Sequence, residues 1–275
     1  MNTQKIGFIG AGNMARALAS GLINNGWKPS NILLSDPDAG TRQSLTGQLK
    51  VTVYEQNNDV VDGSDIVVFA VKPQILREVA TAVATNVQAR KPLVISIAAG
   101  VRSGDLEHWL GGNLSLVRVM PNTAALVGSG ASGLYANTHA SNEARNIAET
   151  VMRAVGVVAW VTNEDHLDIV TALSGSGPAY YFLIMEALEQ AAIDLGLPAD
   201  TARLLTLETA YGAAKMALEG GEEPSILRQQ VTSKGGTTER ALQVMEQNHI
   251  RDIYRQALTA AAERSKELAK LLGKD

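Results

Sequence analysis

Short apolar runs that end at glycine, proline or polar residues recur through the first half of the chain. They predict strands at residues 6–9, 32–36, 51–53, 65–71, 93–97 and 114–120, with edge strands at 133–136 and 157–161. Between them, apolar residues at helical spacing predict helices at 75–87, 106–110 and 143–155. Strands that alternate with helices are typical of α/β proteins, so we expect a doubly wound, mostly parallel sheet covered on both faces.

The second half has helical spacing without strands. Helices are predicted at 179–195, 201–218, 225–230, 239–248 and 252–272. The first is apolar on almost every face, which predicts burial from several directions, and a region of this size needs a second subunit to supply that cover. The next carries small residues that permit close packing. We therefore divide the chain into a dinucleotide-binding domain, 1–163, and an all-α substrate-binding and oligomerisation domain, 164–275.

The first strand runs directly into a glycine motif, Gly10-x-Gly12-x-x-Ala15, and then into a helix. Gly10 permits the tight turn, Gly12 lets the backbone approach a pyrophosphate, and Ala15 lets the helix pack against the strand. Free N–H groups of the first helical turn attract phosphate. This arrangement predicts a Rossmann-type nucleotide site.

The other predicted strands end in small or turn-forming residues too, at 35–36, 70–73, 98–100 and 120–123. Ligands of open α/β sheets bind outside the carboxyl ends of the strands. The strand ends therefore support the nucleotide prediction independently of the glycine motif.

The composition argues against several classes of partner and cofactor. The chain has 275 residues, 45% of them hydrophobic and 19% charged, and a formal net charge of −4, which gives no sign of a nucleic-acid partner. Without cysteine and with only four scattered histidines, we expect no disulfide and no metal site. No apolar run approaches the roughly 20 residues that span a membrane, and the first strand starts too early for a signal peptide, so a cytoplasmic location is expected.

Two breaks in the helical half suggest function. Leu173-Ser-Gly-Ser-Gly-Pro178 opens a long helix, and a kink or a helix start would also explain it. Val231-Thr-Ser-Lys-Gly-Gly-Thr-Thr-Glu-Arg240 gathers glycines, hydroxyls and free N–H groups at a helix N-terminus. That second loop could receive a carboxylate, although a threonine cap with a glycine turn is the simpler explanation.

These motifs resemble the pyrroline-5-carboxylate reductase family. The resemblance lies in six stretches that run in order along the chain: 8–14, 70–73, 96–100, 118–123, 174–180 and 231–238. The first is shared with many dehydrogenases, whereas the last two together are specific to this family. Where the family usually has proline after the serine of the last stretch, this chain has Lys234, which we expect to alter loop rigidity and local charge more than the chemistry.

The resemblance implies the reduction of 1-pyrroline-5-carboxylate to L-proline by hydride from a nicotinamide, in a homodimer or larger homo-oligomer. It implies cofactor-binding residues at Gly10, Ala11, Gly12, Asn13, Met14, Ser35, Asn57, Val71, Lys72, Ala98, Ala99 and Asn122. It implies substrate contacts at Glu164, Gly235, Gly236, Thr237 and Thr238. We choose Thr238 as the hydroxyl that hydrogen-bonds the ring nitrogen, by positioning rather than by acid catalysis, with solvent able to supply the proton.

Other functions remain open at this stage. A 3-hydroxyacid dehydrogenase shares the two-domain plan and uses a catalytic lysine. Lys215 could be that lysine, although a solvated lysine on a helix is the simpler interpretation. No residue of the sequence distinguishes a pyrroline reductase from a reductase of another cyclic imine, such as a six-membered ring. A non-enzymatic nucleotide-binding protein is also compatible with the fold alone.

The choice of nicotinamide rests on conflicting signals. Asp36, at the end of the second strand, is placed to bind a ribose 2′-hydroxyl, which favours NADH. The resemblance implies NADPH, for which Ser35 offers a hydroxyl and Arg42 a charge. We expect NADPH to be preferred and NADH to be usable.

Overall fold

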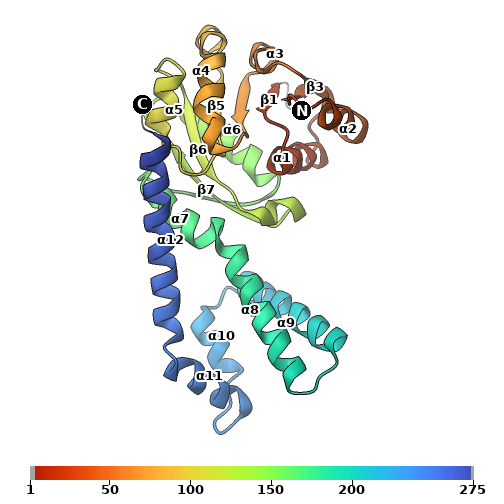
Figure 1. The fold of residues 1–275 in the computed structure, drawn as a ribbon, viewed down its shortest axis with the longest axis vertical. Helices are drawn as coiled ribbons and strands as arrows, with labels where there is room; N and C mark the ends of the chain where they lie inside the picture. Colours follow the sequence, from red (N-terminus) through yellow and green to blue (C-terminus); the bar gives the residue numbers. More distant parts are fainter. Residues whose placement is uncertain (1–3, 274–275) are drawn as a thin grey trace. The chain divides into compact units, whose positions relative to one another are not determined.

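A computed structural model describes residues 4–273, and an eight-stranded sheet forms the centre of its larger part (Figure 1). The strands are β1 (Ile6–Ile9), β2 (Ile32–Ser35), β3 (Thr52–Tyr54), β4 (Ile66–Phe69), β5 (Leu93–Ser96), β6 (Leu116–Met120), β7 (Gly130–Ala136) and β8 (Gly156–Trp160). They lie in the order β3-β2-β1-β4-β5-β6-β7-β8, parallel except where β7 runs antiparallel to β6. The predicted doubly wound, mostly parallel sheet is therefore confirmed.

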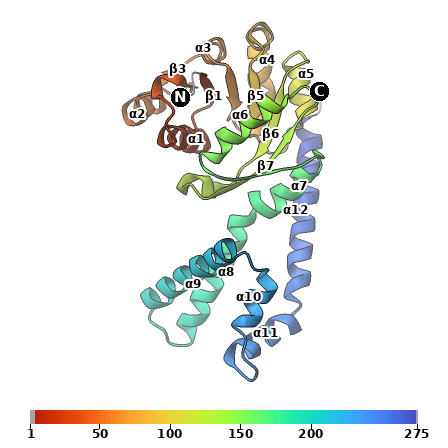
Figure 2. The ribbon, with the colours of Figure 1, turned by 180° about the vertical axis from the view of Figure 1, so that it is seen from behind.

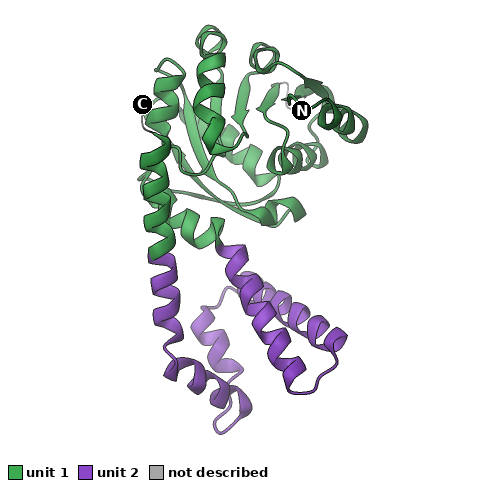
Figure 3. Cartoon of the chain, in the orientation of Figure 1, with its two compact units in different colours: residues 1–176, 260–275 green, residues 177–259 purple. Residues whose placement is uncertain are grey.

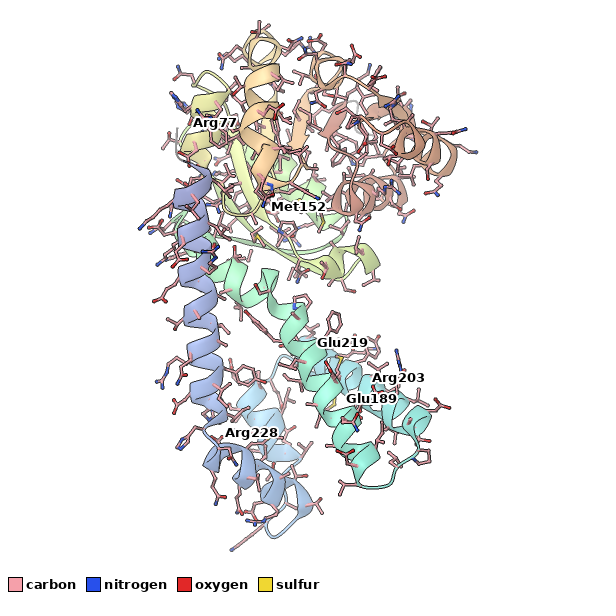
Figure 4. All side chains as sticks on the ribbon, in the orientation of Figure 1. Arg77, Met152, Glu189, Arg203, Glu219 and Arg228 are labelled. Carbon is pink, nitrogen blue, oxygen red and sulfur yellow. The ribbon has the colours of Figure 1, made fainter. Side chains whose placement is uncertain are left out.

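Helices cover both faces of this sheet, as Figures 1 and 2 show from opposite sides. One hydrophobic cluster joins the sheet to α1 (Asn13–Asn24), α2 (Ala39–Leu49) and α6 (Asn142–Arg153), where Met152 is completely buried (Figure 4). A second joins it to α3 (Asn57–Asp62), α4 (Pro73–Arg90) and α5 (Ser103–Trp109). Successive strand residues such as Phe8 and Ile9 enter opposite clusters because side chains alternate across a strand.

Several short elements were not predicted. They are α3, the 3₁₀ turns η1 (Pro29–Asn31) and η2 (Thr123–Val127), and α7 (His166–Val170), which continues into a π-helical segment, η3 (Thr171–Gly175). Strand β7 is longer than predicted and lies between β6 and β8, so its prediction as an edge strand was wrong. Hydrogen bonds to β6 on one side and to β8 on the other hold β7 inside the sheet.

The chain forms two compact units (Figure 3): unit 1 comprises residues 1–176 and 260–275, and unit 2 comprises residues 177–259. Unit 2 contains α8 (Gly177–Asp194), α9 (Ala199–Gly220), α10 (Pro224–Gln230), α11 (Thr237–Gln247) and the start of α12 (Ile250–Leu272). These limits differ from the division that we predicted at 163 and 164, because α7, η3 and the end of α12 pack with the sheet unit.

Buried polar contacts hold the end of α12 in unit 1. The Ser265 hydroxyl donates to the Asp168 carboxylate over 2.6 Å, and Asp168 also pairs with Arg102 at 3.5 Å. Arg102 forms a second ion pair with Asp165, which raises the pKa of Arg102 and lowers that of Asp165. Leu268 and Leu272 lie beside Gly100, whose φ of +73° suits glycine. The loop after β5 is thus fixed by the chain's last helix.

Unit 2 exposes much apolar surface. On α8, Tyr181, Phe182 and Leu183 are each about two-thirds exposed, and a cavity of about 450 Å³ between α8 and α9 is lined by apolar side chains. Figure 4 shows the side chains of α8 and α9 standing clear of the ribbon, with Glu189 and Arg203 labelled on the two helices. No helix within residues 4–273 is both long enough and apolar enough to cross a membrane.

Candidate active site

The glycine turn after β1 has the geometry of a phosphate-binding turn. Gly10 has a φ of +94°, and a Cβ there would lie 2.9 Å from the Ala70 carbonyl oxygen, so only glycine fits. At Gly12, by contrast, a Cβ would meet no atom of the protein within 4 Å. The protein's own packing does not require that glycine, and the open space suits a ligand that approaches the backbone.

Helix α1 begins directly after this turn without a side-chain cap. The N–H groups of Asn13, Met14 and Ala15 find no acceptor within residues 4–273. Unpaired N–H groups and the positive end of the helix dipole favour a phosphate at this place. These residues therefore fit the pyrophosphate of a dinucleotide.

A cavity of about 350 Å³ lies next to the turn, at the carboxyl ends of the central strands. Six of the predicted cofactor residues line it: Met14, Val71, Lys72, Ala98, Ala99 and Asn122. The lining also contains Ile97, Pro73, Met120, Pro121, Thr123 and Gly175, which we had not assigned to the cofactor. The structure thus gathers residues from four separate strand ends around one space, as the order of parallel strands requires.

Two more predicted cofactor residues, Ser35 and Asn57, are bonded to each other. The Ser35 side chain is buried and donates to Asn57 Oδ1 over 2.8 Å, so it lies behind Asn57. The Asp36 carboxylate accepts from the N–H groups of Ala11, at 3.3 Å, and Asp38, at 3.0 Å. Asp38 in turn caps α2 through the Thr41 N–H, which lowers the pKa of Asp38. This edge of the site therefore carries ordered negative charge.

Arg42 lies beneath the same turn. Its guanidinium donates to the carbonyl oxygens of Asp36, at 3.0 Å, and Pro37, at 2.8 Å, and it pairs with Glu55 at 3.3 Å. A phosphate that recruited Arg42 would have to replace some of these contacts. The prediction that Arg42 reaches a 2′-phosphate stays a prediction.

Glu164, predicted to touch the substrate, is already engaged within unit 1. Its carboxylate accepts from the Ser103 N–H and hydroxyl, at 2.6 and 2.8 Å, and pairs with buried Arg118 at 3.1 Å. It caps α5 and neutralises a cation inside the sheet, which would otherwise be costly. A lone arginine within the apolar strand 114–120 was the sequence signal for this partner, and we did not use it. A substrate contact at Glu164 stays a prediction.

The glycine–threonine loop lies in unit 2, between α10 and α11. Gly235 has a φ of +74°, and Gly236 is the N-cap of α11, which has no side-chain cap. Thr232 donates its hydroxyl to Arg228, whereas the hydroxyls of Thr237 and Thr238 have no partner within the described chain. The predicted residues therefore lie together at the start of α11 and have unused hydrogen-bond donors.

Glu239, which we had not assigned, also belongs to this loop. Its carboxylate accepts from the Gly235 N–H over 2.7 Å, a capping contact that satisfies a loop donor. The N–H groups of Thr237, Thr238 and Glu239 itself find no acceptor within residues 4–273. A ligand carboxylate that approached the start of α11 would meet these free N–H donors, with the Glu239 carboxylate beside them.

The cavity and loop include no arrangement typical of metal catalysis. Within residues 4–273, no group of three or more His, Asp or Glu side chains is placed to hold a metal ion. Lys215, the alternative catalytic lysine, is half-exposed on α9 and lies 4.0 Å from Glu219, labelled in Figure 4. This is the geometry of a solvated helical lysine, which gives the hydroxyacid alternative no support.

The sheet order, the glycine turn and the cavity are those of a dinucleotide-binding protein, here with a second, helical unit. Residues 164–268 match the family model described as pyrroline-5-carboxylate reductase dimerisation, and residues 5–100 match NADP oxidoreductase coenzyme F420-dependent. The pyrroline-5-carboxylate reductase of Pseudomonas aeruginosa is 46% identical over 273 residues, covering 99% of this chain and 100% of the relative. The chain belongs to the pyrroline-5-carboxylate reductase family.

Solved structures agree with this assignment. A pyrroline-5-carboxylate reductase from Coxiella burnetii has a TM-score of 0.94 at 46% identity, covering 98% of this chain and 99% of that one. The Plasmodium falciparum pyrroline carboxylate reductase, solved with NADP bound, has a TM-score of 0.86 at 30% identity, covering 98% and 99%. The predicted fold class and family are confirmed.

Proposed function

We propose that this protein reduces 1-pyrroline-5-carboxylate to L-proline with NAD(P)H, the last step of proline biosynthesis. The observation that carries the proposal is the full-length match to relatives of this name. The cavity in unit 1 and the loop in unit 2 supply structural counterparts for cofactor and substrate. NADPH as the preferred donor, with NADH usable, a homo-oligomeric state and a cytoplasmic location are parts of the same proposal.

The cofactor site fits a dinucleotide. The unpaired N–H groups of Asn13, Met14 and Ala15 face the pyrophosphate position, and open space at Gly12 admits it. Residues 71–72 line the cavity along the proposed path of the cofactor, and residues 98–99 and Asn122 line it where we propose the nicotinamide half to bind. When bound, the reduced nicotinamide supplies the hydride.

The chain's own residues orient the substrate. The N–H groups at the start of α11 are placed to bind a carboxylate, with the helix dipole adding to the attraction. The unpartnered Thr238 hydroxyl is our choice for the hydrogen bond to the ring nitrogen. Protonation of that nitrogen makes the adjacent carbon a better hydride acceptor, and one hydride and one proton together convert the imine to the amine. A threonine hydroxyl is a poor acid, so it positions the ring while water supplies the proton.

Substitution of Thr238 tests the proposal. We expect Thr238→Ala to lower kcat/KM for the pyrroline by roughly ten- to a few hundred-fold, the effect of one well-placed hydrogen bond. The Kd for NADPH should change little. Thr238→Ser should restore most of the activity, and Thr232→Ala, whose hydroxyl is already bonded to Arg228, serves as the matched control. Full activity in Thr238→Ala would leave the hydroxyl without a role.

A panel of five- and six-membered cyclic imines and 3-hydroxyacids, assayed with the purified protein, separates the alternatives. Reduction of the five-membered carboxylate alone supports the proposal. Preference for a six-membered ring would make the chain a reductase of another imine. Cofactor binding without turnover of any substrate would favour a nucleotide-binding role.

A further inference from the structure

The Asn122 side chain joins three segments of unit 1 just beyond the end of β6. Its Oδ1 accepts from the Ala131 N–H of β7 over 3.1 Å, and its Nδ2 donates to the Ser174 carbonyl and hydroxyl at 3.3 and 3.4 Å. The Ser174 hydroxyl donates in turn to the Ala131 carbonyl over 2.9 Å. These bonds close a ring of three residues, which we call the Asn122–Ser174 clamp.

The clamp uses most of the hydrogen-bonding capacity of Asn122. A primary amide has two N–H donors and one carbonyl oxygen with two lone pairs. In Asn122 the nitrogen is directed at Ser174 and one lone pair is taken by Ala131. Although Asn122 lines the cavity, its amide has little capacity left for a nucleotide. Its effect on the cavity must come mainly through the segment that it holds.

That segment forms part of the cavity wall. Gly175, directly after Ser174, lines the cavity together with Met120. A Cβ on Gly175 would collide with the terminal methyl of Met120, so the two residues are in tight contact. A shift of Gly175 by the size of one methyl group would therefore alter the shape of the cavity.

Gly175 and the residues before it in this wall have an unusual backbone conformation. Residues 171–175 form a π-helical turn, closed by the bond from the Ser176 N–H to the Thr171 carbonyl at 2.8 Å. Such turns are rare, and they occur frequently at functional sites because they redirect side chains and backbone within a helix. Here the clamp fixes the π turn against β6 and β7.

We propose that Asn122 is a positioning residue that acts through Ser174 to hold Gly175 as a wall of the nicotinamide part of the cavity. The clamp sets how the reduced ring lies for hydride transfer and contributes little to cofactor affinity. For its catalytic consequence, this inference rests on the function proposed above. The clamp itself lies entirely in unit 1.

Asn137 offers a matched control. Its amide also uses most of its capacity, with bonds to the Leu116 N–H, the Leu114 carbonyl and Glu107, but it lies at the start of β6 rather than at its end. Asn122→Ala removes a partly buried clamp and Asn137→Ala a buried one, at opposite ends of the same pair of strands. Only the first adjoins the cavity. Thermal unfolding of both variants shows whether their losses of stability match.

The experiment measures kcat/KM for the pyrroline, the Kd of NADPH, and the fluorescence of bound NADPH, which reports the surroundings of the reduced ring. We expect Asn122→Ala and Ser174→Ala to lower kcat/KM about 10- to 100-fold, as small misplacements of reacting groups do. The Kd should stay within about threefold while the fluorescence changes. Ser174→Thr should restore most of the activity, and Asn137→Ala should change neither kcat/KM nor fluorescence.

Three results would overturn the inference. A Kd that rises as much as kcat/KM falls in Asn122→Ala would make the amide a direct cofactor contact. An equal loss of activity in Asn137→Ala would show that the clamp affects activity only through the overall stability of the protein. Unchanged fluorescence in both clamp variants would show that Gly175 does not shape the ring's surroundings. If the wild type binds NADPH but reduces no pyrroline, the proposed function fails, whereas the fluorescence comparison still decides the clamp.

Discussion

The Asp36 carboxylate has a structural role in the glycine turn, and we expect its charge to affect the choice between NADPH and NADH. Its carboxylate bonds the Ala11 N–H of the glycine turn, and Arg42 beside it is held by two carbonyl oxygens and Glu55. A 2′-phosphate bound at this edge would meet the Asp36 carboxylate and compete for Arg42. A ribose 2′-hydroxyl would instead find an acceptor. We therefore expect the Asp36 carboxylate to weaken the preference for NADPH over NADH.

We expect Asp36→Ser to raise the ratio of kcat/KM for NADPH to that for NADH by roughly tenfold, or about 1.4 kcal/mol, because it removes a like charge from the phosphate position. Steady-state kinetics with both donors at one pyrroline concentration give the ratio. Glu143→Gln, which removes a charge from α6, should leave it unchanged. A constant ratio in Asp36→Ser would show that the carboxylate does not face the ribose. Arg42→Ala completes the test, since a loss confined to NADPH would place the phosphate beside Arg42.

The position of several predicted residues around one cavity could be foreseen from the sequence, but their hydrogen bonds could not. Strand ends and the family resemblance pointed to Asn122, and the structure puts it at the cavity. Its bonds reach Ala131 and Ser174, and the latter lies 52 positions along the chain, a pairing that no local pattern encodes. The same holds for Glu164 with Ser103, which are separated by 61 positions.

Charged side chains secure the exposed edge of the sheet at β8. Trp160 at the end of β8 donates its indole N–H to Glu149 of α6 over 2.7 Å, and Arg153 donates to the same carboxylate over 2.7 Å. The Arg145 guanidinium lies 5.5 Å from the centre of the Trp160 ring. An edge strand needs such cover, because its free backbone groups otherwise invite pairing with other chains.

The bonds from Trp160 and Arg153 lower the pKa of Glu149 below its ordinary value of 4.5. A group whose pKa is lower in the folded state stabilises the fold above its unfolded pKa, and this contribution is lost as pH falls through the folded pKa. We therefore expect the stability advantage of wild type over Glu149→Gln, measured by urea unfolding, to be constant near neutral pH and to decline below about pH 4.5. A difference that does not vary with pH would contradict this.

The main elements were predictable and the short ones were not. Every strand was predicted to within a few residues, because the apolar run of a central strand fills both hydrophobic clusters, one on each face of the sheet. The turns of α3 and α7 are too short to show a helical period, and the π turn at 171–175 has no sequence pattern of its own. Long-range packing decides such segments.

At the scale of the whole molecule, unit 2 leaves its apolar helices without cover in a single chain. Phe182 and Leu183 on α8 are each 64% exposed, and the cavity between α8 and α9 is lined by apolar groups. Obligate subunit interfaces have this composition, and the family model that matches residues 164–268 is one of dimerisation. The limits of unit 1 were less predictable, since residues 260–275 return to it from beyond unit 2.

We expect an obligate homodimer, or a larger assembly built from it, and we expect Leu183→Glu to weaken it because a charge would be buried in the interface. Sedimentation velocity at low micromolar concentration measures the change. Val157→Glu, at a similarly exposed apolar position on β8, should leave the assembly intact. A folded, active wild-type monomer at this concentration would refute the prediction.

The return of α12 to unit 1 also affects how the chain folds as it leaves the ribosome. Domains generally fold in the order in which they are synthesised. Here the Ser265 partner of Asp168 and the leucines beside Gly100 are translated only after all of unit 2. A nascent chain arrested at residue 259 should therefore be cut by protease in the 98–102 loop more readily than the same chain extended through residue 275, and equal protection would argue against this order. The nucleotide-binding unit, although it begins first, is completed last.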